Sequence, residues 1–130
     1  MSAETTALGL AAILQAVQIG LAGMSMNRDV GAKWNAGPRD TQPALSARTG
    51  RLRRAVTNHF EALAFFTIAV LMVSLEDRSD ALTVFCAWLY LAARILYVPA
   101  YAFGWSPWRS VIWGVGFLAT MAMIVIALLT

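Results

Sequence analysis

The sequence predicts an all-α integral membrane protein, a four-helix bundle, from three observations. Hydrophobic residues make up 59% of the 130 residues and charged residues only 13%, whereas about 25% of the residues in a soluble domain are charged. Four apolar stretches each approach the ~20 residues that a helix needs to cross the hydrocarbon layer of a membrane. Arginines gather between the first two stretches, as they do in cytoplasmic loops. A soluble domain this short could not bury so much apolar surface.

The apolar stretches place four helices at residues 4–26, 50–75, 80–103 and 108–129, within a single transmembrane domain that covers residues 1–130. The first stretch lacks the basic residues that begin a secretory signal sequence, so we expect it to be retained as a helix. The connection between the first two helices is long, and its asparagine, glycine and proline residues predict turns.

Loop charges predict how the helices are oriented in the membrane. The first loop is basic and Arg109 makes the third loop basic, whereas residues 76–80, the second loop, are mainly acidic. Because basic loops stay in the cytoplasm, we expect both termini on the opposite, periplasmic side. Orientation and headgroup contact explain arginines at a membrane edge, so we expect a lipid bilayer as partner and no nucleic acid.

The second helix carries a polar stripe in a segment that otherwise resembles a membrane span. At about 100° per residue, Arg51, Arg54, Asn58 and Glu61 fall within roughly 80° of arc. Lipid does not tolerate such a face, which must therefore contact protein, water or a polar ligand.

The third helix has a second stripe, because Tyr90, Arg94, Tyr97 and Tyr101 fall within roughly 60° of arc. At 1.5 Å per residue, Arg94 and Glu61 both lie about 15 Å from the cytoplasmic ends of their helices. We expect the two charges to pair, since an unpaired charge at that depth costs several kcal/mol. The pair would bind a ligand or only fix the register of the two helices.

Near the cytoplasmic boundary the stripes and the start of the fourth helix predict a site for a small polyanion, because guanidinium groups bind carboxylates in bidentate fashion. Contact with lipid headgroups is the alternative, and it explains Lys33, Arg48 and Arg53 better than the stripes. The single histidine, His59, lies off the stripe and is interpreted as an interface residue, and with a single cysteine no metal site is expected. The predicted polyanion site consists of Arg51, Arg54, Asn58, Tyr97, Tyr101, Arg109 and Ser110.

At these residues the chain resembles the MAPEG family, the membrane-associated proteins of eicosanoid and glutathione metabolism. The run RLRRAVTNHFE at 51–61 is similar to the second-helix signature of the family. The run RILYVPAY at 94–101, followed by Arg109 and Ser110, is similar to its third and fourth helices. The resemblance covers nearly the whole chain, and the first loop is similar to that of the bacterial branch, which implies a bacterial inner membrane.

The resemblance implies a homotrimer that binds glutathione, as co-substrate, in clefts between protomers near the cytoplasmic side. It implies that Arg109 holds the glutathione thiolate as a catalytic group, with Ser110 beside it. It assigns glutathione binding to Arg54, Asn58, Glu61, Tyr101 and, from the neighbouring protomer, Arg28. We add Arg51, Arg94 and Tyr97 to these binding residues because they share the polar stripes.

The residues and the resemblance together predict a membrane-bound glutathione-dependent transferase or peroxidase that acts on lipophilic electrophiles or hydroperoxides. Thr57, Tyr97 and Trp113 stand where prostaglandin-synthase-like members have an arginine, a histidine and a tyrosine, which argues against that activity. Two alternatives are a non-catalytic lipid-binding or partner-presenting membrane protein of the same fold, and a structural bundle that its arginines only orient. Arg109 favours the enzyme, because a lipid binder needs no cation to stabilise a thiolate.

Overall fold

The computed structural model describes residues 1–40 and 44–129, and in these ranges the chain forms five helices and no strand. Four of the helices are long and apolar enough to cross a membrane, which confirms the predicted fold class of an integral membrane four-helix bundle. The helices are α1 (Ala3–Val30), α2 (Ala32–Ala36), α3 (Ala47–Leu75), α4 (Ala81–Ala102) and α5 (Trp108–Leu128).

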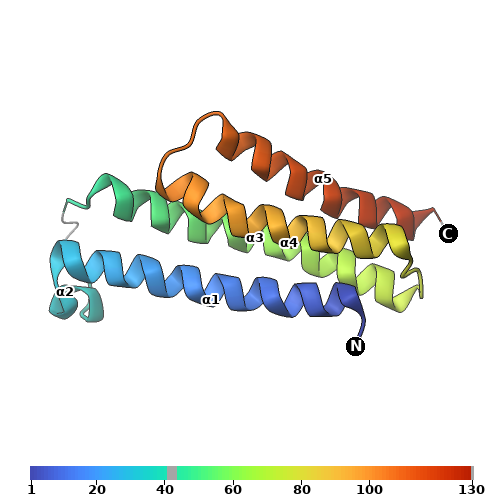
Figure 1. Cartoon of the computed structure of the whole chain (residues 1–130). Coiled ribbons are helices and arrows are strands. Elements are labelled where there is room, and N and C mark those ends of the chain that lie inside the picture. The colour runs from blue at the N-terminus through green and yellow to red at the C-terminus, as the bar shows by residue number, and fades with distance from the viewer. Residues whose placement is uncertain (41–43, 130) are drawn as a thin grey trace.

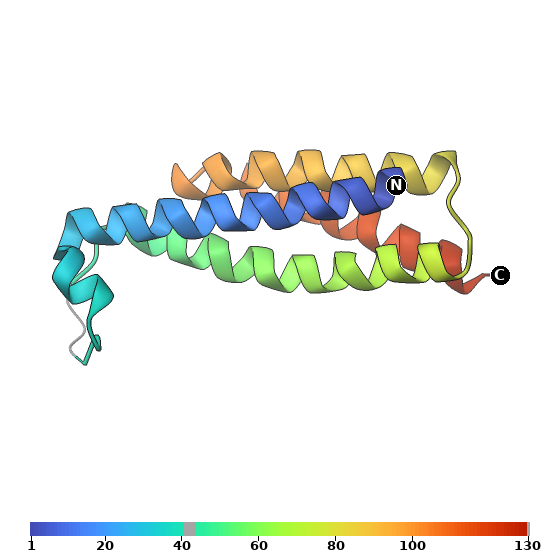
Figure 2. The same ribbon diagram turned by 90° about the horizontal axis from the view of Figure 1, so that it is seen from below.

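The long helices run alternately up and down the bundle (Figures 1 and 2). The N-terminus, the α3–α4 turn and the C-terminal end of α5 lie at one end, whereas α2 and the α4–α5 turn lie at the other. α3 and α4 pack against each other, and each also packs against α1 and α5. Tyr90, Arg94 and Tyr97 of the α4 stripe are buried inside the bundle, whereas Arg54 and Glu61 of the α3 stripe are exposed.

Side-chain caps define where the helices begin. The hydroxyl of Ser2 accepts a hydrogen bond from the backbone of Thr5 at 3.1 Å at the start of α1. Asp80 and Thr83 form a reciprocal capping box at the start of α4. α1 ends at Val30, four residues beyond the predicted limit, and is followed by Gly31 with a φ of 88°. α2 comes next, in what the sequence predicted as a loop.

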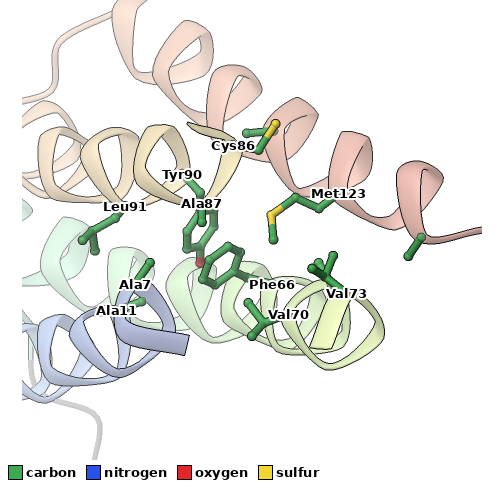
Figure 3. Close-up of a cluster of buried hydrophobic side chains, with 13 residues drawn as sticks. Ala7, Ala11, Phe66, Val70, Val73, Cys86, Ala87, Tyr90, Leu91 and Met123 are labelled. Atoms are coloured by element: carbon green, nitrogen blue, oxygen red, sulfur yellow. The ribbon is translucent and has the colours of Figure 1, made fainter. Parts of the chain in front are cut away.

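Small and aromatic side chains form the core at the level where α1, α3, α4 and α5 are closest. The rings of Phe66 and Tyr90 stack with centroids 3.9 Å apart (Figure 3). Ala7 and Ala11 are fully buried, and their small side chains let α1 approach α3 and α4 closely. Cys86 is a buried member of this core.

Large apolar side chains also cover much of the outer surface. Leu71, Leu96 and Leu118 are each more than half exposed. In a soluble monomer so many exposed apolar residues would be unfavourable, whereas hydrocarbon chains or further copies of the protein would cover them without cost. The outer surface thus matches a protein that lies in the bilayer.

The expected orientation predicts which turn a membrane-impermeant maleimide labels in intact cells. In a Cys86→Ala background, Glu76→Cys in the acidic α3–α4 turn should react without permeabilisation, because that turn is expected in the periplasm. Ser106→Cys in the α4–α5 turn should react only after permeabilisation. The reverse labelling pattern would show that the bundle is inserted the other way round.

Candidate functional site

The arginines at the start of α3 reach the C-terminal end of α4. Arg51 donates from Nε to the backbone carbonyl of Ala102 at 2.9 Å. One turn later, Arg54 donates from Nε to the hydroxyl of Tyr101 at 3.1 Å. These two arginines of the α3 stripe therefore both bond to α4.

Arg94 is the centre of a buried polar network that joins three helices. Its Nε donates to Nδ1 of His59, and its Nη1 donates to Oδ1 of Asn58, both at 3.1 Å. Nε2 of His59 lies 3.0 Å from the carbonyl oxygen of Ala11 on α1. The guanidinium carbon of Arg94 lies 4.2 Å from the ring centroid of Tyr97, which adds a cation–π contact. Arg94 is only 2% exposed, so nearly all of this network is shielded.

The expected ion pair between Glu61 and Arg94 does not form in the described residues. Arg94 instead donates hydrogen bonds to His59 and Asn58. Its third nitrogen, Nη2, is buried without a hydrogen-bond partner among the described residues. Asn58 and His59 lie closer than Glu61 to the N-terminal end of α3, and the Nε and Nη1 atoms of Arg94 bond to these two residues. The Glu61 side chain is exposed at the rim of a cavity that Arg94 also lines.

The cavity shared by Glu61 and Arg94 lies between α3, α4 and α5 and has a volume of about 140 Å³. Phe65, Trp113 and Phe117 supply much of its wall. The buried hydroxyl of Tyr90, another lining residue, has no hydrogen-bond partner, like Nη2 of Arg94. An apolar wall with two unpartnered polar groups at one side is suited to a molecule with a polar head.

A second cavity, of about 190 Å³, lies nearer than the first to the N-terminal ends of α3 and α5 and shares Trp113 with it. Four residues of the predicted site, from three different helices, meet here. The guanidinium of Arg109 is exposed and lies 4.9 Å from the ring centroid of Tyr101. No ion pair neutralises Arg109 within the described residues. The lining residues of the cavity are Asn58, Tyr97, Arg109, Ser110 and Trp113.

The structure therefore brings together most of the predicted residues. Tyr101 lies between Arg54 and Arg109, since it accepts a hydrogen bond from the first and stacks under the second. Arg28 stands apart, because it is exposed on the last turn of α1 and lines neither cavity. Sequence reasoning missed the bond from Arg94 to His59. One feature of the sequence pointed to this bond: apart from Glu61, His59 is the only titratable residue at that depth of the second helix.

The model of the MAPEG family matches residues 5–129, nearly the whole chain. The chain belongs to the MAPEG family. Membership makes this chain one of a group of glutathione-related integral membrane proteins. No curated protein and no solved structure matches this MAPEG protein. Across residues 1–40 and 44–129, no three His, Cys, Asp or Glu side chains are grouped to hold a metal ion.

The network around Arg94 predicts which pairs of substitutions are coupled in stability. Arg94→Gln and Asn58→Ala should show a coupling energy of about 1 kcal/mol, typical of the stronger interhelical hydrogen bonds in membrane proteins. Arg94→Gln and Glu61→Gln should be additive within about 0.5 kcal/mol. The free energy of unfolding in mixed micelles measures both cycles. A larger coupling with Glu61 than with Asn58 would contradict the observed hydrogen bonds.

Proposed function

We propose that this protein is a membrane-bound glutathione-dependent transferase or peroxidase that acts on lipophilic electrophiles or hydroperoxides. The observation that supports it is the cavity where Arg109 and Ser110 of α5 meet Asn58 of α3 and Tyr97 of α4. Arg109 presents an unneutralised guanidinium to this cavity. Such a cation lowers the pKa of a thiol beside it, from about 8.5, and increases the fraction of reactive thiolate.

The cationic and amide groups around this cavity suit the carboxylates of glutathione. Arg54 and Arg51 are fixed at the end of α4 by hydrogen bonds to Tyr101 and to a backbone carbonyl. Each of these guanidinium groups bonds there through Nε, which leaves its terminal nitrogens available for a carboxylate. Glu61, at the rim of the neighbouring cavity, is the carboxylate best placed for the ammonium group of the tripeptide.

The glutathione thiolate reacts in one of two ways, with an electrophilic carbon or with a hydroperoxide. The thiolate, held by Arg109 with Ser110 beside it, attacks an electrophilic carbon and forms a C–S bond as the leaving group departs or a ring opens. With a hydroperoxide, the thiolate attacks the distal oxygen and the O–O bond breaks. The alcohol leaves, and a second glutathione converts the sulfenic acid to the disulfide with loss of water.

The proposed assembly is a homotrimer in a bacterial inner membrane, with the site toward the cytoplasm and both termini in the periplasm. Glutathione then enters from the cytoplasm, and the lipophilic substrate enters from the bilayer along the apolar wall of Phe65 and Phe117. In a trimer a neighbouring protomer supplies Arg28, which within one chain lies apart from both cavities.

A non-catalytic lipid-binding or partner-presenting role is the second candidate, and the apolar wall of the first cavity favours it. The two functions differ in what they require of Arg109. Lipid binding in the cavity shared by Glu61 and Arg94 does not involve Arg109, whereas thiolate formation depends on it.

Native mass spectrometry of the detergent-solubilised protein tests the assembly and the thiol together. We expect a complex of three chains that gains the mass of glutathione when glutathione is added. A complex of the expected size that never gains this mass would remove glutathione from the proposal and leave the lipid-binding function.

Substitution of Arg109 separates the enzyme from the binder. Arg109→Leu should reduce turnover of chlorodinitrobenzene about tenfold or more, because a rise of about one in the thiol pKa lowers the thiolate fraction about tenfold. Arg109→Lys should keep part of the activity, since a single sulfur requires charge more than fork geometry. Thiolate absorbance in the ultraviolet should fall in parallel with turnover.

The matched control is Arg78→Leu, which removes a cation from the α3–α4 turn at the opposite end of the bundle. It should leave turnover within about twofold of the unmutated protein. Unchanged turnover in a correctly folded Arg109→Leu protein would overturn the role of Arg109 in holding the thiolate.

A further inference from the structure

We propose that His59 is a positioning residue: through Arg94 it fixes the carboxamide of Asn58 so that the cavity between Asn58 and Arg109 receives only hydrogen-bond acceptors such as a carboxylate or thiolate. The inference rests on the proposed function for the identity of the ligand, but its structural part concerns only this chain. It follows from the donor and acceptor chemistry of three consecutive contacts.

The first contact fixes the state of the His59 ring. The Nε group of an arginine can only donate, so Nδ1 of His59 must accept the hydrogen bond from Arg94. Nε2 then carries the proton and donates to the carbonyl oxygen of Ala11 at 3.0 Å. His59 is fully buried between these two partners, so its ring has one orientation and one tautomer.

The second contact fixes the fork of Arg94. His59 holds Nε, and the ring of Tyr97 packs against the guanidinium plane at 4.2 Å. With the plane and one nitrogen held, Nη1 is directed at Asn58. Without His59, the Nε of Arg94 would have no hydrogen-bond partner in a site shielded from water. The cost of this buried, unpartnered donor favours a different rotamer of Arg94.

The third contact fixes the polarity of Asn58. Because Nη1 can only donate, the atom of Asn58 that faces it is the carbonyl oxygen, Oδ1. Asn58 also lines the second cavity, so the group left for a ligand there is the Nδ2 amide, which donates. A carboxamide turned by 180° would offer an acceptor to the cavity instead.

The other polar groups of the second cavity agree with this polarity. Arg109 can only donate. The hydroxyl of Tyr97 is buried and lies beside the guanidinium of Arg109. Ser110 can donate or accept, and no carboxylate lines the cavity. The cavity therefore favours an anionic acceptor over an ammonium group, and His59 maintains that preference from outside the cavity.

Two substitutions of His59 each keep one of its two hydrogen bonds. The Oδ1 of asparagine reaches the position of Nδ1, so His59→Asn keeps the acceptor for Arg94 and loses the bond to Ala11. The Nε2 of glutamine reaches the position of Nε2, so His59→Gln keeps the donor to Ala11 and loses the acceptor for Arg94. Thr83→Val is a control for loss of stability. It removes the 2.8 Å hydrogen bond from Thr83 to Glu4, which joins the start of α4 to the start of α1, far from His59.

Two measurements are made on the full-length protein in detergent. The first, which needs no ligand, is the side-chain amide signal of Asn58 in a spectrum of nitrogen-15-labelled protein, assigned by its loss in Asn58→Asp. The second is the Kd for glutathione, with the midpoint of thermal unfolding recorded for each variant. The amide signal reports the hydrogen bond from Arg94, and the Kd reports its consequence.

We expect His59→Gln to shift the Asn58 signal and to weaken glutathione binding about tenfold, the effect of one hydrogen bond to a charged group. His59→Asn should keep the signal and bind within about threefold of the unmutated protein, although it unfolds at a lower temperature. Thr83→Val should also lower the unfolding temperature and leave both readouts unchanged.

An unshifted Asn58 signal in His59→Gln would overturn the positioning role, whatever the affinity. Equal losses of affinity in His59→Asn, His59→Gln and Thr83→Val, in proportion to stability, would overturn it as well. If the unmutated protein binds no glutathione, the proposed function fails, and the Asn58 signal still decides the role of His59.

Discussion

The hydrogen bonds of Arg94 are the interaction on which the rest of the site depends. A guanidinium inside a membrane protein costs several kcal/mol unless its donors are satisfied. Here His59 and Asn58 satisfy two of its nitrogens, and the Tyr97 ring covers its face. Arg94 on α4 thus connects to α3, and because His59 also bonds to Ala11, the connection continues from α3 to α1. Movement of any of these helices would leave a buried donor unsatisfied.

The fold could be predicted from sequence because each step depends on local composition. A stretch of about 20 apolar residues has few stable structures other than a helix in a bilayer, where every backbone group must be bonded internally. The same reasoning placed Arg51, Arg54 and Asn58 on one face of α3, and the structure has all three facing α4 or the cavities. α2 was not predicted, because five residues give too weak a periodic pattern to recognise.

The partner of Arg94 could not be predicted, because a helical wheel treats each side chain as a point. Charge and depth favour Glu61 as the partner, and His59 lies outside the stripe. A long arginine side chain, however, reaches residues across a wide arc of a neighbouring helix and at other axial positions. The choice then depends on the helix separation and on the packing of Tyr97, which are properties of the folded bundle.

Arg94 and Arg109 lie on neighbouring helices, and their surroundings give them opposite roles. Arg94 is buried and held by neutral acceptors, so its charge serves to orient Asn58. Arg109 is exposed, stacks on the Tyr101 ring and has no ion pair in the described part of the chain, so its charge is available to an anion. Aromatic stacking orients a guanidinium without neutralising it. In the proposed function, the bundle thus separates the cation that maintains the geometry from the cation that acts on a thiol. Trp113, which lines both cavities, is where a thiolate on the polar side would meet a lipophilic molecule on the apolar side.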